Sequence, residues 1–76
     1  MSGETPKLTA AQVLRALRKG GWMEQRQSGS HLVLIHAVKP GQVIVPVHAR
    51  KTIKEGTMRS ILKMAGLTAE EFRRLL

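Results

Sequence analysis

The chain has 76 residues and no cysteine, which excludes a separate cofactor domain, a disulfide scaffold and a thiolate zinc site. It lacks the apolar core of a signal peptide and any run approaching the roughly 18 apolar residues of a membrane span, so we expect a soluble cytoplasmic protein that binds no membrane. Its 13 Lys and Arg against 5 Asp and Glu give a formal net charge of +8, which favours a polyanionic partner, most often nucleic acid for a small cytoplasmic domain.

A helix is predicted over residues 9–20. Thr9 and Gln12 have the spacing of a capping box, in which two side chains bond backbone N–H groups at the start of a helix. Apolar residues then recur at helical spacing, and the pair Gly20-Gly21 is typical of a helix end. The residues on the apolar face are Ala10, Val13, Leu14 and Leu17.

Three predicted strands follow the helix. Residues 22–27 alternate weakly, residues 31–37 are dense in branched apolar side chains, and residues 43–47 form the last strand. Short turn clusters separate them, so an antiparallel meander is expected. Pro46 has no N–H to donate to a ladder, and the last strand should therefore be an edge or be bulged at that point.

A basic connection over residues 48–54 leads to two further predicted helices. Thr57 is a plausible cap of the first, which should end at Gly66. Thr68 and Glu71 have capping-box spacing and predict a short third helix. The basic residues of the connection are His48, Arg50, Lys51 and Lys54, and the apolar stripe of the first of these helices is Met58, Ile61, Leu62 and Ala65.

These elements predict an α+β fold in the order α-β-β-β-α, followed by a short C-terminal helix. The helices should cover one face of a three-stranded antiparallel sheet. Residues 1–8 are expected to be flexible, and residues 9–76 to form a single domain.

Four segments in this order resemble the HicA toxin family, the RNA-cleaving half of a bacterial toxin–antitoxin pair. The resemblance covers about residues 8–73, nearly the whole chain. It implies an α-β-β-β-α fold similar to a double-stranded RNA-binding domain, which agrees with the order of the predicted elements. The segments are Gly20-Gly21-Trp22, Gly29-Ser30-His31, Val45-Pro46-Val47-His48, and residues 56–67 followed by Glu70-Glu71-Phe72.

The catalytic histidine of that family falls on His31. The resemblance implies ribosome-independent cleavage of messenger RNA, silenced when a HicB-type antitoxin binds. RNA carries its own nucleophile, the ribose 2′-hydroxyl, so a base that takes its proton requires no metal and no cofactor. General acid–base catalysis of this kind is typically worth about 10²–10⁴-fold.

Basic side chains near the second predicted helix are expected to bind RNA phosphates: Lys51, Lys54, Arg59 and Lys63. The N-terminal amides of that helix also favour anions, and Arg59 and Lys63 lie one turn apart on a shared face. His48 ends the third strand and is expected either to act as the acid that complements His31 or to contact phosphate. Affinity for RNA should therefore fall steeply with salt.

Structural roles for these histidines remain open alternatives. His31 could cap a turn, and His48 could be a solvated strand end. His36 should point to the opposite face of the sheet from His31 and is left out of the site. Trp22 is expected to pack in the core rather than stack on a base. No metal site is expected, because no histidine pair has helical ligand spacing and no carboxylate accompanies one.

Other functions are also open at this point. The same cations would serve a non-catalytic RNA-binding module of the same fold, or a DNA-binding protein. The basic residues could also form an ordinary solvated face or bind an acidic protein.

Overall fold

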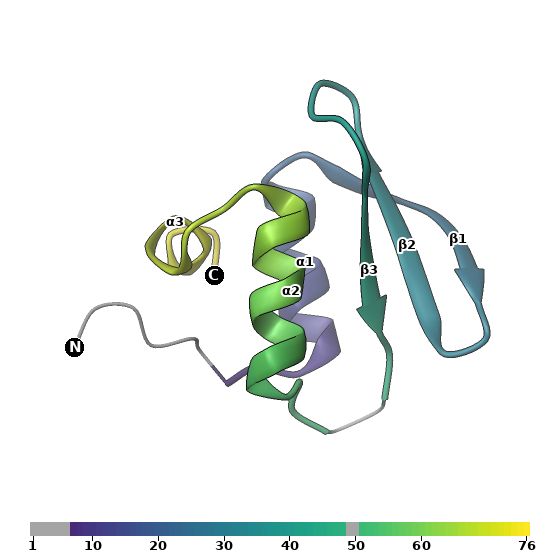
Figure 1. Cartoon of the computed structure of the whole chain (residues 1–76), viewed down its shortest axis with the longest axis vertical. Coiled ribbons are helices and arrows are strands. Elements are labelled where there is room, and N and C mark those ends of the chain that lie inside the picture. The colour runs from purple at the N-terminus through teal and green to yellow at the C-terminus, as the bar shows by residue number, and fades with distance from the viewer. Residues whose placement is uncertain (1–6, 49–50) are drawn as a thin grey trace.

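The computed structural model describes residues 7–48 and 51–76. Figure 1 shows its elements in chain order, which confirms the predicted α-β-β-β-α order and the short C-terminal helix. Arg50 and most of the segment expected to be flexible lie outside the described residues. The elements are α1 (Ala10–Lys19), β1 (Trp22–Ser28), β2 (His31–His36), β3 (Gln42–Pro46), α2 (Glu55–Ala65) and α3 (Ala69–Arg73).

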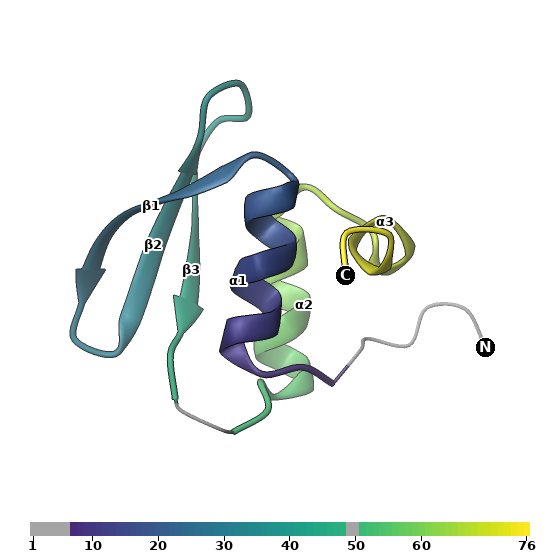
Figure 2. The ribbon, with the colours of Figure 1, turned by 180° about the vertical axis from the view of Figure 1, so that it is seen from behind.

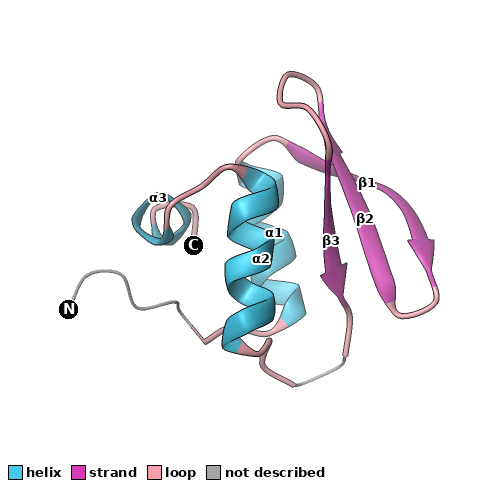
Figure 3. Cartoon of the chain, viewed as in Figure 1, coloured by secondary structure: helices cyan, strands magenta, loops and turns pink. Residues whose placement is uncertain are grey.

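The strands form one antiparallel sheet in the order β1-β2-β3, as expected for a meander. Helices α1 and α2 run in the same direction along one face of this sheet, and α3 lies on their far side (Figures 1 and 2). The layers are clearest in Figure 3, where the helices and strands are coloured separately. None of the described helices is long and apolar enough to cross a membrane.

The core lies between the sheet and the helices. Leu32 and Leu34 of β2 belong to it, whereas Val33 between them is buried outside this cluster. This alternation is the strand period of two, and it shows which face of β2 meets the helices. The largest fully buried side chains include Trp22 of β1 and Phe72 of α3, so the prediction that Trp22 packs in the core is confirmed.

Helix α1 begins as its sequence predicts. Thr9 is the N-cap, its N–H donates to Gln12 Oε1 at 2.9 Å, and its Oγ1 accepts from the Gln12 N–H at 3.4 Å. The helix ends at Lys19, where the Gly20 N–H bonds the carbonyl groups of the last turn. The predicted range 9–20 thus includes the two cap residues that flank the helix.

His36 fastens the end of α1 to the turn between β2 and β3. Its Nδ1 accepts hydrogen bonds from the backbone N–H groups of Val38 and Lys39, both at 3.0 Å. Nε2 must then carry the ring proton, and it lies 3.0 Å from the Gly20 carbonyl oxygen. A Cβ at Gly21, which has φ of 97°, would approach Nε2 to 2.6 Å. This packing confirms that His36 faces away from His31, and its role is structural.

Strand β3 is an edge of the sheet and ends at Pro46, as the missing N–H of proline predicts. No bulge is needed there. The irregularity lies in β1, where the pairing shifts between Glu24 and Arg26. The predicted strand ends differ from the observed ones by a residue or so.

The prediction that Thr57 caps α2 is wrong. The helix begins at Glu55 with Lys54 as its N-cap, and no side chain caps it. Ile53 is buried and its N–H bonds the Leu8 carbonyl at 2.7 Å, which fixes the chain just before the helix. The Met58 N–H therefore already bonds the Lys54 carbonyl at 2.8 Å, and Thr57 lies within the first turn.

Helix α3 has the predicted capping box. Glu71 Oε1 accepts from the Thr68 N–H at 2.8 Å, and Thr68 Oγ1 accepts from the Glu71 N–H at 3.0 Å. The backbone hydrogen bond from Thr68 is the main reason that the pKa of Glu71 is lowered, and the positive charges of Lys39 and Arg74 act in the same direction.

Replacing Glu71 with Gln is expected to remove a pH-dependent part of the stability. Because folding lowers the pKa of Glu71, the carboxylate stabilises the fold fully above its unfolded pKa, and this contribution is lost as the pH falls through the folded pKa. Urea unfolding of the wild type and Glu71→Gln should differ most at neutral pH and converge in acid. Glu70→Gln is the control, because Glu70 bonds Arg74 instead of the backbone. A difference that does not change with pH would contradict this account.

Candidate functional site

His31 is the first residue of β2 and its side chain is exposed. It pairs with Ser28 of β1 and with Pro46 of β3. Since Leu32 packs toward the helices, the strand period places the His31 imidazole on the other face of the sheet. Among the described elements, all the helices lie on the far side of the sheet from this face (Figure 1).

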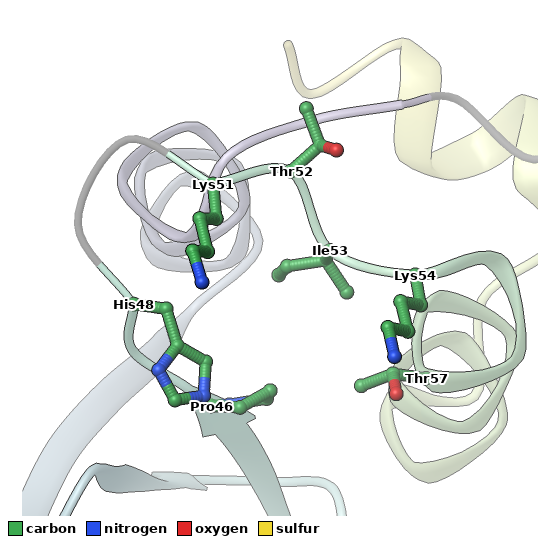
Figure 4. Close-up of a pocket in the computed structure, with 7 residues that line it drawn as sticks. All are labelled: Pro46, His48, Lys51, Thr52, Ile53, Lys54 and Thr57. Atoms are coloured by element: carbon green, nitrogen blue, oxygen red, sulfur yellow. The ribbon is translucent and has the colours of Figure 1, made fainter.

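A cavity of about 370 Å³ lies between the end of β3 and the start of α2. Figure 4 shows His48 and Lys51 on one side of it and Lys54 and Thr57 on the other, with Pro46 and Ile53 between them. The titratable residues that line it are all histidine or lysine. The full set of lining residues is Pro46, His48, Lys51, Thr52, Ile53, Lys54 and Thr57.

Backbone hydrogen bonds hold the walls of this cavity. The Val47 N–H bonds the Ser30 carbonyl at 2.6 Å, which extends the pairing of β2 and β3 beyond Pro46. The Lys51 N–H bonds the His48 carbonyl at 3.2 Å. An isolated bridge between Thr9 and Thr52 then joins this connection to the start of α1. The basic connection is thus attached to both the sheet and a helix.

Pro46 links His31 to the cavity. Residues directly opposite each other in an antiparallel pair have Cβ atoms about 4.5–5.5 Å apart and point to the same face. His31 and Pro46 are such a pair, and Pro46 lines the cavity. His31 is not itself a lining residue; it is the cross-strand partner of one. Pro46 is therefore the residue that connects the predicted catalytic histidine with the cavity that three of the predicted RNA-binding residues line.

Arg59 and Lys63 occupy a different flank of α2. Arg59 follows Thr57 by two residues, which turns its side chain about 200° around a helix of 3.6 residues per turn. Both are exposed, and Arg59 pairs with Glu55 at 3.3 Å. The structure does not bring them to the cavity. A role for them in binding RNA stays a prediction for a separate surface.

Four lining residues were not predicted as site residues from the sequence: Pro46, Thr52, Ile53 and Thr57. Ile53 has the apolar side chain typical of a core residue, and Thr57 was predicted to cap a helix. The signal that could have identified Thr57 is its position one turn after a lysine-rich connection. Among the described residues, no group of three or more His, Cys, Asp or Glu side chains is arranged to hold a metal ion.

The chain matches a known protein family over most of its length. The model of the HicA toxin of bacterial toxin–antitoxin systems matches residues 10–67. The chain belongs to the HicA toxin family. This gives it the role of a toxin in a bacterial toxin–antitoxin system and implies an antitoxin partner. A comparison with curated proteins found no significant match.

The match to HicA runs from the first residue of α1 to Leu67, which follows α2. It includes His31 and every residue that lines the cavity. Helix α3 lies beyond it, although Phe72 from α3 is fully buried in the same core.

Proposed function

We propose that this HicA toxin is an endoribonuclease that cleaves messenger RNA, with His31 as the general base. The observation that carries the proposal is an exposed histidine paired across the sheet with Pro46, which lines a cavity together with His48, Lys51 and Lys54. Membership of the HicA family supports it. A polyanion that binds the lysines would have to extend past the end of β3 to reach the imidazole of His31 on the other face of the sheet.

The reaction needs only groups that RNA and this chain supply. His31 takes the proton of a ribose 2′-hydroxyl, and the resulting oxyanion attacks the adjacent phosphorus. The bond from phosphorus to the 5′-oxygen of the next nucleotide breaks, and that oxygen takes a proton from an acid. The products are a 2′,3′-cyclic phosphate and a 5′-hydroxyl end. His48 would either donate this proton to the 5′-oxygen, in place of water, or bind a phosphate.

Lys51 and Lys54 would bind a phosphate of the RNA next to the reacting bond. They are exposed, and the residues that share the cavity with them carry no negative charge. An ammonium group near the phosphorane stabilises the charge that develops in the transition state. Counterion release from the RNA would make this binding weaken as salt is added.

The antitoxin is proposed to be of the HicB type, and mRNA as the substrate would place the toxin in the cytoplasm. An acidic protein encoded by the neighbouring reading frame would support this pairing. If no acidic protein is encoded there, the proposed pairing with a HicB-type antitoxin would be weakened.

Purified protein is expected to cleave an unstructured RNA in the presence of EDTA and to leave cyclic phosphate ends. Mass spectrometry of the products is the measurement. The same oligonucleotide with 2′-deoxyribose throughout should stay intact, because the nucleophile is missing. Cleavage of that oligonucleotide, or 5′-phosphate ends on the RNA products, would exclude the proposed chemistry. Equal affinity for duplex DNA and RNA without RNA cleavage would favour a DNA-binding protein.

A further inference from the structure

We propose that the cavity between β3 and α2 is a subsite for one unpaired nucleotide of single-stranded RNA. Its base would lie against Pro46 and Ile53, and its phosphate would lie between Lys51 and Lys54. This inference rests on the proposed function and deepens it, because it names the form of RNA that the site accepts.

The shape of the cavity fits a base better than a phosphate alone. A volume of about 370 Å³ falls within the range of roughly 300–1,000 Å³ that is typical of small-molecule sites. Pro46 is half-buried, and Ile53 lines the hollow although it is only 7% exposed, so part of the lining is apolar. A site for inorganic phosphate would need polar groups in these positions instead.

Polar groups surround this apolar surface. The hydroxyl of Thr57 could donate to or accept from the edge of a base, and the imidazole of His48 offers a ring on which a base can stack. Lys51 and Lys54 stand on opposite sides of the hollow (Figure 4). Their ammonium groups are therefore placed for the phosphate of a nucleotide whose base is inside.

The pairing of Pro46 with His31 indicates where on the RNA the bound nucleotide would lie. Pro46 forms one wall of the cavity and is the cross-strand partner of His31. A nucleotide bound there would be close to the phosphodiester bond that breaks in the proposed reaction. A base inside a duplex is stacked and paired and cannot enter such a hollow, whereas unpaired bases can be splayed out. The cavity thus selects single-stranded RNA.

The test uses the full chain labelled with nitrogen-15 and titrated with each of the four 3′-nucleoside monophosphates and with inorganic phosphate. The nucleotides should shift the backbone amide signals of Ile53 and Thr57 and bind about tenfold or more tightly than inorganic phosphate. Equal affinity for inorganic phosphate would show that no base enters. Unmoved signals from these two amides would show that the cavity is not the site.

Two variants and a matched control sharpen the test. Lys54→Gln should weaken nucleotide binding by about tenfold, because a charge-assisted contact is lost. Thr57→Leu fills the hollow without changing charge and should weaken it as well. Lys19→Gln makes the same change of charge at an exposed position on α1 and should have no effect. Equal losses in Lys54→Gln and Lys19→Gln would overturn the subsite.

Competition separates single strands from duplexes. A 2′-deoxy single-stranded hexamer, which cannot be cleaved, should displace the bound nucleotide, and a blunt duplex of the same sequence should not. Displacement by both would overturn the selection of single-stranded RNA. Nucleotide binding does not depend on cleavage, so the two proposals can fail separately. If RNA is cut but the Ile53 and Thr57 signals do not move, the subsite alone fails. If nucleotides bind there and no RNA is cut, the endoribonuclease proposal fails.

Discussion

The His31→Ala variant is expected to cleave RNA about 10²–10⁴-fold more slowly than the wild type, which is the usual contribution of a positioned acid or base. Its affinity for RNA should change little, because the lysines of the cavity remain. The free energy of unfolding should stay within about 0.5 kcal/mol, as for most surface substitutions. Single-turnover cleavage, RNA titration and urea unfolding measure the three quantities.

Ser28→Ala is the matched control for His31→Ala. Ser28 is the cross-strand partner of His31 on β1, and it is also exposed. Truncating it disturbs the same part of the sheet without removing a group that can take a proton. A His31→Ala variant that cuts RNA as fast as the wild type would rule out the general-base role. Equal loss of binding and cleavage would assign His31 to RNA binding instead.

The Phe72→Ala variant should lose about 3–5 kcal/mol of stability, the usual cost of truncating a buried phenylalanine. Phe72 is fully buried and belongs to the main core, although α3 has only five residues. A helix of this length is not stable in isolation. The attachment of α3 to the core therefore depends on the Phe72 side chain. Since domains are typically stable by only about 5–15 kcal/mol, much of the protein could unfold. Urea unfolding monitored by far-ultraviolet circular dichroism measures the loss.

Leu76→Ala serves as the comparison for Phe72→Ala. Leu76 is also an apolar residue of the C-terminal segment, but it is 49% exposed. Its truncation should cost less than about 1 kcal/mol. If both variants lose the same small amount, α3 would be peripheral to the core.

Local chemistry explains which elements were predictable from the sequence. The capping boxes of Thr9 and Thr68 are formed by residues three positions apart, so their spacing alone indicates the helix starts. The start of α2 was different. No side chain caps it, and the residue before its N-cap, Ile53, bonds Leu8, which is 45 residues away in the sequence; no local pattern contains that information.

The candidate site could also be predicted only in part from the sequence. His31 was identified from the resemblance to the HicA family and the lysines from residue type and position, but their relation in the fold depends on the pairing of His31 with Pro46. Arg59 and Lys63 are close to Lys54 in sequence, and the turn of the helix directs them elsewhere. The cavity itself could not be predicted, because its walls come from the end of a strand, a connection and the first turn of a helix.

The position of α3 has a practical consequence for studying this toxin. The C-terminus follows α3, on the far side of the helices from the sheet (Figures 1 and 2). The uncovered face that carries His31 is on the other side of the molecule. A fluorescent protein or affinity tag fused after Leu76 should therefore leave RNA access to His31 unobstructed, and the tagged toxin can be used in cleavage assays.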